Sequence, residues 1–270
     1  REEGCEFRSH IDGSKHIFTP ENVMDTQRII GADIMMAFDE CPPGQSDYQY
    51  AKKSLMMTQR WLDRCFKRFN ETEPLYGHSQ SLFPIVQGCT FKDLRQEAAK
   101  FIADKGADGN AIGGLAVGES HEEMYKIIDA VEPFMPDDRP RYLMGVGTPS
   151  NIIEAVARGV DFFDCVMASR NARHGFIFTH SGTLNMMNAK HTLDTRPLDE
   201  ECHCPACQHY TRAYIHHLFK AKEMLAMRLC VLHNLYFFND LLARIRLAIE
   251  EDRFDEFRYE NSGKLDRRII

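Results

Sequence analysis

The sequence predicts an α/β fold with a parallel sheet, arranged as a barrel or as a doubly wound sheet. Short and almost continuously apolar segments alternate with longer segments of helical periodicity, which is typical of strands buried on both faces. Strands are expected at 33–40, 82–88, 141–147 and 160–166, with a glycine-rich strand and turn at 109–119, and helices are expected at 47–69, 91–105, 120–132 and 149–158. Each strand ends in polar or glycine residues, and in both folds the chemistry lies at these ends.

Two regions flank this alternation. Residues 5–18 predict a hairpin around Asp12-Gly13, and the Thr19-Pro20 pair that follows is typical of a helix start. After residue 175 the pattern changes to a second hairpin, around Ser181-Gly182. Helices are then expected over 208–229 and 234–250.

Composition narrows the classes of protein that fit. The chain has 270 residues and a formal net charge of −7, which does not suit a protein that grips a long duplex by its phosphates. No apolar run approaches the roughly 20 residues that cross a bilayer, so no membrane partner is expected. Nine cysteines, an odd number and mostly scattered, indicate reduced thiols and a cytoplasmic protein.

Three of these cysteines lie within six residues and predict a metal site. Cys202, Cys204 and Cys207 place three thiolates on one loop, which suits tetrahedral zinc better than a chance cluster of thiols. Candidate fourth ligands are His203, His209, His216, His217 and His233. Spacing favours His233, expected just after the first helix. Four protein ligands leave no position for water, so the zinc would be structural.

Several segments together resemble the tRNA-guanine transglycosylase family. The cysteine motif, followed after 25 residues by histidine, is similar to that family's zinc pattern, and FDCVMASRNARHG (163–175) resembles its nucleophile segment. Shorter matches occur in the family's order at MAFDEC (36–41), VQG (86–88), GGLAVGE (113–119) and YLMGVGTP (142–149). The resemblance covers essentially the whole chain. It implies a TIM (β/α)8-type barrel, incomplete at its N-terminal side, with a zinc-binding helical insertion near the C-terminus.

The implied boundaries are barrel elements in 1–187, a zinc-binding module in 188–233, and a C-terminal barrel helix and tail in 234–270. The family's second catalytic aspartate would lie upstream of residue 1, so the natural chain is expected to be longer. The nucleophile segment has two departures from the family pattern: Ala168-Ser169 replaces the usual Pro-Thr, and His174 replaces Asn.

The resemblance implies that Asp164 attacks the ribose carbon that carries a guanine of tRNA. A carboxylate suits this step because it can trap an oxocarbenium-like centre as a covalent ester. The incoming base would be 7-aminomethyl-7-deazaguanine (preQ1), since Cys41 and Val117 match the bacterial form of the family. Base contacts are implied for Asp39, Cys41, Gln87, Gly114, Leu115 and Met144. Outside the family context, Asp164 would be a strand-end cap or a helix-start residue, and Met144 a core residue.

The implied partners are the tRNA anticodon loop, the preQ1 or guanine base, and a second copy of the chain. Tyr214 and His217 match positions of the family's dimer interface. RNA contacts are implied for Gly145, Val146, Gly147, Thr148, Pro149, Ser150 and Asn151, and for Ser169, Arg170, Asn171, Ala172 and Arg173. The simpler alternative for the arginines is a solvated surface.

Other functions stay open from the sequence. A non-catalytic RNA-binding partner subunit of the same family is the main alternative, although such subunits tend to lose the nucleophile that Asp164 supplies here. An archaeosine-type enzyme would carry a further C-terminal RNA-binding domain. A metallohydrolase barrel would need metal ligands at the strand ends. Apart from zinc, no cofactor is expected.

Overall fold

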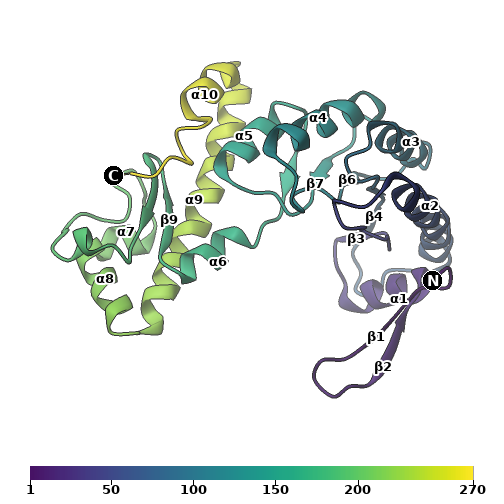
Figure 1. The fold of residues 1–270 in the computed structure, drawn as a ribbon, viewed down its shortest axis with the longest axis horizontal. Helices are drawn as coiled ribbons and strands as arrows, with labels where there is room; N and C mark the ends of the chain where they lie inside the picture. The colour runs from purple at the N-terminus through teal and green to yellow at the C-terminus, as the bar shows by residue number, and fades with distance from the viewer. Residues whose placement is uncertain (270) are drawn as a thin grey trace. The chain divides into compact units, whose positions relative to one another are not determined.

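The computed structural model describes residues 1–269, which divide into two compact units. Unit 1 contains Arg1–Gly145 and Arg158–Phe163, and unit 2 contains Val146–Ala157 and the chain from Asp164 onward. Figure 1 follows the chain through both units. None of the helices within residues 1–269 is both long enough and apolar enough to span a membrane.

Unit 1 has the predicted α/β architecture with parallel strands. Its strands form one sheet in the order β3-β4 and another in the order β5-β6-β7-β8, with every pair parallel. Their bounds are β3 (Ile34–Met36), β4 (Ser81–Phe83), β5 (Ile85–Val86), β6 (Asn110–Ile112), β7 (Arg141–Leu143) and β8 (Phe162–Phe163). The predicted N-terminal hairpin is also present, as β1 (Cys5–Arg8) and β2 (Lys15–Phe18) paired antiparallel.

The strands are shorter than predicted, and one predicted strand is two. The apolar run 82–88 divides at Pro84 into β4 and β5, which belong to different sheets. Proline has no N–H to donate to a ladder, so it ends regular pairing on one side. The carbonyl of Pro84 still accepts from the N–H of Ala111 at 2.9 Å, which continues the contact toward β6.

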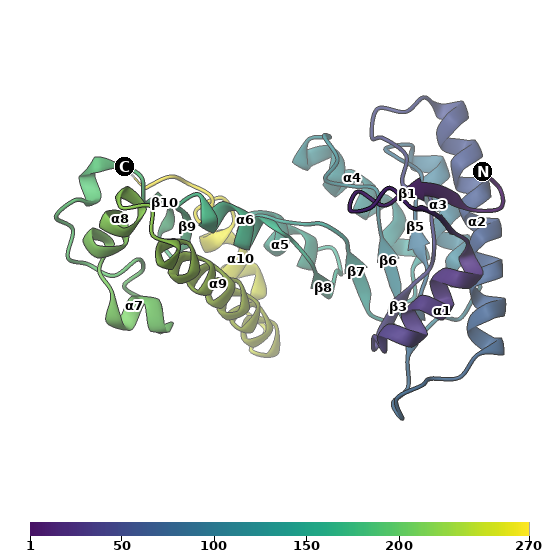
Figure 2. The same cartoon turned by 90° about the horizontal axis from the view of Figure 1, so that it is seen from below.

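The helices of unit 1 agree closely with the sequence pattern. They are α1 (Pro20–Ile30), α2 (Tyr48–Glu71), α3 (Lys92–Ala103), α4 (His121–Val131) and the short 3-10 helix η1 (Glu132–Phe134). Thr19, Asp47 and Ser120 cap α1, α2 and α4 with their side chains, which satisfies N–H groups that have no partner in the first turn. Figure 2 shows α1, α2 and α3 beside the strands of this unit.

Unit 2 is mainly helical and is built around one hairpin. The hairpin is β9 (Phe176–Thr179) and β10 (Gly182–Asn185), antiparallel as predicted. The other elements are α5 (Pro149–Val156), α6 (Met167–Arg173), η2 (Ala189–His191), α7 (Pro205–His209), α8 (Arg212–Lys220), α9 (Met224–Glu250) and α10 (Phe254–Asn261). The helices α6, α7, α8 and α10 all pack against α9, which also contacts β9.

The predicted pair of helices over 208–229 and 234–250 is wrong in its boundaries. The chain breaks at Tyr210-Thr211, where Thr211 caps α8, and again at 221–223 before α9 begins. Helix α9 then continues through 230–234 without a turn. The buried stripe of α9 includes Cys230, His233 and Phe237, so tertiary burial sustains the helix where the sequence suggested an end.

Candidate base-binding site and metal centre

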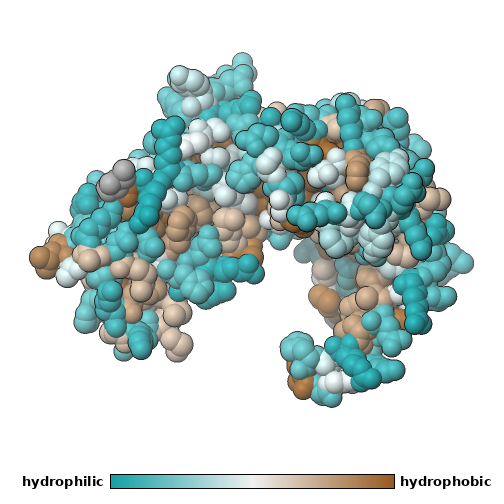
Figure 3. Space-filling model, in the orientation of Figure 1, coloured by the Kyte–Doolittle hydropathy of each residue, from teal (hydrophilic) through white to brown (hydrophobic). Residues whose placement is uncertain are grey.

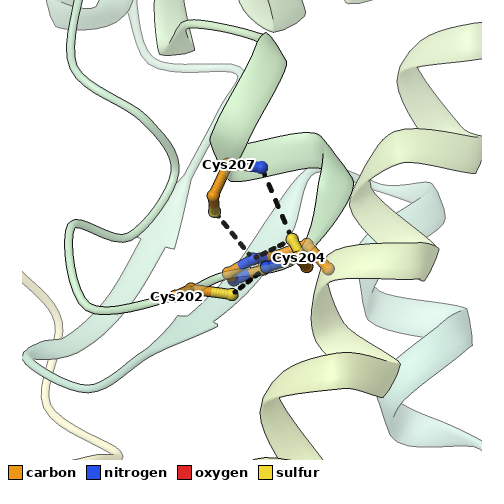
Figure 4. A group of neighbouring side chains, drawn as sticks. Cys202, Cys204 and Cys207 are labelled. Atoms are coloured by element: carbon orange, nitrogen blue, oxygen red, sulfur yellow. Dashed lines mark hydrogen bonds between the residues drawn. The ribbon is translucent and has the colours of Figure 1, made fainter.

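The predicted metal ligands converge in unit 2. One ligand atom from each of Cys202, Cys204, Cys207 and His233 lies within 4.8 Å of all the others. The Nδ1 atom of His233 is 3.6 Å from the sulfur of Cys204 and 3.3 Å from that of Cys207. Figure 4 shows the three cysteine side chains directed toward a common centre. Residue Cys207 is half-buried, and the other three residues are buried.

The donor set and its spacing fit a tetrahedral zinc ion. Bonds of about 2.3 Å to sulfur and about 2.0 Å to nitrogen would place these atoms roughly 3.5 Å apart. The Nε2 atom of His233 lies 2.8 Å from the carbonyl oxygen of Phe178. A carbonyl only accepts, so Nε2 carries the proton and Nδ1 presents its lone pair to the sulfurs. Outer contacts of this kind orient histidine ligands in metal sites.

Local sequence explains why the cysteine loop folds as it does. Cys204 is the N-cap of α7 and its sulfur accepts from the N–H of Cys207, while Pro205 occupies the first turn. His203 between the ligands is exposed, as expected. His233 reaches the cluster from within α9 rather than from a turn after a helix. His233 therefore joins the cluster as predicted, although from a different structural position, and its role as a metal ligand stays a prediction.

In unit 1, the predicted base contacts gather at the carboxyl ends of β3, β5 and β6. The amide Nε2 of Gln87 donates to the carboxylate of Asp39 at 2.6 Å. Burial raises the pKa of Asp39, although the hydrogen bond from Gln87 acts in the opposite direction. Asp39 and Cys41 both line a cavity of about 570 Å³ with Phe38 and Trp61 in its wall.

The remaining predicted base contacts surround Gln87. Gly114 has φ +62°, and a Cβ there would lie 2.3 Å from Oε1 of Gln87, so only glycine fits. A Cβ on Gly113 would meet the sulfur of Met144 at 3.4 Å, so Met144 lies against the same strand end. Leu115 is buried directly after Gly114. The structure thus brings Asp39 and Gln87 together and places the glycine backbone beside them.

Sequence reasoning missed Arg95, which connects these strand ends. Its side chain is buried on α3, and its guanidinium donates to the carbonyls of Val86, Cys89, Gly113 and Gly114 at 2.6–3.0 Å. A signal was present, because Arg95 occupies the same helical stripe as the buried residues Ala98, Ala99 and Ile102. A charged residue inside an apolar stripe needs a buried partner.

Comparison with known proteins decides the family. The family model described as queuine tRNA-ribosyltransferase matches residues 1–266. A queuine tRNA-ribosyltransferase of Clostridium perfringens (strain SM101 / Type A) is 59% identical over 261 residues, which is 96% of this chain and 69% of that protein. One of Clostridium tetani (strain Massachusetts / E88) is 59% identical over 271 residues, 98% of this chain and 72% of that protein.

The chain belongs to the queuine tRNA-ribosyltransferase family. The predicted membership is confirmed, and with it the TIM-barrel class of the fold. A third relative with the same name, from Clostridium botulinum (strain Loch Maree / Type A3), is 58% identical over 261 residues, 96% of this chain and 69% of that protein.

The residues that the family likeness assigns to the nucleophile and to RNA belong mostly to unit 2. Asp164 follows β8 directly and its side chain is exposed. On α6, Arg170 and Arg173 are exposed, whereas Ala172 is buried in the core of unit 2. Their roles in catalysis and RNA binding stay predictions.

The loop before α5 combines exposed backbone with buried anchors. Thr148 caps α5 and its hydroxyl donates to Asp266 at 2.7 Å. Val146, Gly147, Pro149 and Asn151 are buried, and Gly145 is exposed. The buried residues of 145–151 therefore fix the position of the loop backbone. Contact of this segment with RNA stays a prediction.

A second buried polar group in unit 2 was also missed. His180 sits between two carboxylates, with Nδ1 2.6 Å from Asp199 and Nε2 2.9 Å from Asp240. Burial of the imidazole opposes its protonation, but the bonds and charge of the two aspartates outweigh burial and raise the pKa of His180. No sequence spacing indicated this group, because its partners come from 19 and 60 residues away.

Proposed function

We propose that this chain exchanges a guanine in the anticodon loop of tRNA, at the wobble position, for preQ1. The observation that carries the proposal is the Asp39–Gln87 pair at the strand ends of a chain of this family. The relatives bear the name queuine tRNA-ribosyltransferase, which is consistent with base exchange on a ribose of tRNA. Asp164 supplies the nucleophile.

The reaction balances as two displacements at one carbon. A carboxylate oxygen of Asp164 bonds to C1′ of the ribose as the bond from C1′ to N9 of guanine breaks, and the departing base takes a proton from water at N9. The ring nitrogen of preQ1 then bonds to C1′, gives its proton to water, and displaces the carboxylate. Splitting the exchange in this way replaces one difficult displacement with two easier ones.

Recognition of the base would follow from the buried groups in unit 1. Guanine and preQ1 present N–H donors along one edge, which suits the acceptor oxygens of Asp39. Because the carboxylate is largely removed from water, a base without those donors would leave it unpaired, and such mismatches are strongly discriminated against. Cys41 beside Asp39 is the proposed contact for the bacterial substrate.

The RNA would be met as an unstacked loop. A reaction at the bond between ribose and base requires the nucleotide to leave the stack, which is easier in a loop than in a duplex. The exposed arginines Arg170 and Arg173 of α6, with the 145–151 segment, are the proposed contacts to phosphates and bases.

We assign one structural zinc ion to the cluster of Cys202, Cys204, Cys207 and His233. The fit of the donors and of their spacing supports this choice of metal. The ion would supply no reacting group. It would tie the cysteine loop to α9, and through His233 to β9.

A homodimer is proposed from the surface of unit 2. Along α8 and α9, large apolar side chains are exposed, and apolar atoms reach the visible surface over these helices in Figure 3. They are Tyr214, Met224, Leu225, Met227, Leu232, Leu235 and Tyr236. An apolar patch of this kind marks an interaction surface. We place the protein in the cytoplasm, where cysteines stay reduced, because none of its nine cysteines forms a disulfide within residues 1–269.

The proposed function is tested by incorporation of labelled guanine into unmodified tRNA, followed by denaturing electrophoresis to detect a covalent adduct. We expect the adduct with the unaltered chain and none with Asp164→Asn. Asp161→Asn is a matched control, because Asp161 lies at the amino end of β8 and its carboxylate accepts from the backbone of Arg141. An adduct that persists in Asp164→Asn rejects the nucleophile, and no incorporation by the unaltered chain favours the non-catalytic subunit.

A further inference from the structure

Arg95 is an unusual buried cation. Its side chain is 0% exposed, and all four of its hydrogen-bond partners are backbone carbonyls. Removing a charge from water without an opposite charge beside it is costly, and burial lowers the pKa of Arg95 to about 10, so it stays protonated at neutral pH. An apolar side chain in its place would leave the carbonyls of Cys89, Gly113 and Gly114 without this donor, so Arg95 determines where these backbone groups point.

The carbonyls that Arg95 binds belong to the strand ends that carry the base contacts. Nη1 donates to Val86 at 2.9 Å and to Gly113 at 2.7 Å, and Nη2 donates to Gly114 at 3.0 Å. Val86 precedes Gln87, so one guanidinium joins the end of β5 to the end of β6. The planar fork of arginine allows this, whereas a lysine ammonium is a single point with three donors.

Binding two successive carbonyls also fixes two successive N–H groups. In a trans peptide the C=O and the N–H point in opposite directions. Since the carbonyls of Gly113 and Gly114 point toward Arg95, the N–H groups of Gly114 and Leu115 point away from it. Within residues 1–269, neither of these two N–H groups has a hydrogen-bond partner. The left-handed conformation of Gly114, at φ +62°, lies between them.

A pair of unpaired donors near the acceptor Asp39 complements a 6-oxopurine. Guanine carries a carbonyl oxygen at C6 next to the N–H donors of N1 and of the 2-amino group. The Asp39 carboxylate suits those donors, and free N–H groups suit the oxygen. The positive charge of Arg95 on the carbonyl side polarises each peptide group, which strengthens its N–H as a donor.

We propose that Arg95 is a positioning residue that selects for the 6-carbonyl of the base. It orients the two peptide groups between Gly113 and Leu115 so that their N–H groups receive this oxygen, and it does not touch the base itself. The inference rests on the proposed base exchange and adds to it which group sets the preference for an oxopurine.

The test compares two bases in direct binding. 2-Aminopurine lacks the 6-oxygen and also the hydrogen at N1, and it is fluorescent, so its Kd follows from fluorescence titration and that of guanine from displacement of 2-aminopurine. The missing N1–H affects the unaltered chain and the variants alike, so the change in each Kd relative to the unaltered chain isolates the effect on the 6-oxygen. In Arg95→Lys we expect guanine to bind at least ten-fold more weakly and 2-aminopurine to change by less than two-fold. Arg95→Gln, with a neutral amide, is a second variant with the same expectation.

Arg141→Lys is the matched control. Arg141 is also buried in unit 1 and donates to backbone carbonyls, those of Met135 and Pro136, but it begins β7 at the opposite end of the strands. We expect its ratio of the two Kd values to stay within two-fold of the unaltered chain, even if its melting temperature falls as far as that of Arg95→Lys.

Equal weakening of both bases in Arg95→Lys and Arg95→Gln would overturn the inference, because a merely structural role affects both alike. Unchanged binding of both bases, or no guanine binding by the unaltered chain, would overturn it as well. Failure of labelled guanine to enter tRNA, together with the expected Kd ratios, would reject the proposed function while leaving the role of Arg95 in base selection intact.

Discussion

Replacing Cys204 by alanine should weaken zinc binding and destabilise unit 2. Cys204 is 0% exposed and its sulfur lies 3.6 Å from Nδ1 of His233. A structural zinc contributes about 10–16 kcal/mol in small domains, so one of four ligands accounts for roughly 3 kcal/mol if the ligands share it equally. That loss corresponds to an approximately hundredfold lower affinity for zinc and to a fall in Tm of roughly 6–12 °C.

The assay measures zinc content and Tm after dialysis against graded concentrations of a chelator. Cys230→Ala is the matched control, because Cys230 is equally buried in the same apolar cluster and lies one turn before His233 on α9. It should keep one zinc per chain and lose only about 1 kcal/mol through the small cavity. If Cys204→Ala releases zinc at the same chelator concentration as Cys230→Ala, the assignment of the site is refuted.

Three further predictions concern buried groups. Asp39→Asn should raise KM for guanine more than ten-fold, and an unchanged KM would contradict the role of Asp39 in base binding. The same variant should have a higher Tm at pH 7, because a carboxyl group with a raised pKa lowers the stability of the fold once it ionises. Gly114→Ala should raise KM for guanine ten-fold or more, whereas Gly77→Ala, with φ +76° and nothing within 4 Å of its Cβ, should alter only stability; equal KM effects would exclude the clash with Gln87. Because the pKa of His180 is raised in the folded state, its contribution to stability is complete below pH 6.5 and is lost as pH rises through the higher folded pKa. The Tm of His180→Gln should therefore depend less on pH than the Tm of the unaltered chain. Parallel plots of Tm against pH for the two proteins would contradict this.

The features predicted well from the sequence are those that depend on residue type. Zinc chemistry needs thiolates and imidazole, so Cys202, Cys204 and Cys207 predict a metal-binding cluster, and the structure brings these three cysteines together with His233. Helix starts were also predicted well, because capping depends on residue type. The hydroxyl of Thr19, for example, accepts from a backbone N–H in the first turn of α1. Family motifs ordered along the chain gave the candidate base contacts, and the structure joins Asp39 to Gln87 directly.

The features predicted poorly depend on tertiary burial. The sequence suggested an end of the helix near 230, but α9 runs on to Glu250 because the buried stripe through Phe237 and Leu241 continues to pack. Strand lengths were overestimated, since apolar residues continue past the last ladder bond into turns. The division of 82–88 into two strands occurs at Pro84, whose missing N–H interrupts the ladder despite the apolar run on both sides.

In both the metal cluster and the base-binding site, the groups that orient the functional side chains could not be predicted from the sequence, and for the same reason. His233 presents Nδ1 to the sulfurs because its Nε2 is held by the carbonyl of Phe178, and the strand ends around Gln87 are held by the carbonyls that Arg95 binds. A backbone carbonyl is the same for every residue, so no motif records which one a buried side chain will reach. Groups that perform chemistry are constrained in type and can be read from sequence. Groups that orient them are constrained in position, and become apparent only when the buried donors are traced to the oxygens that accept from them.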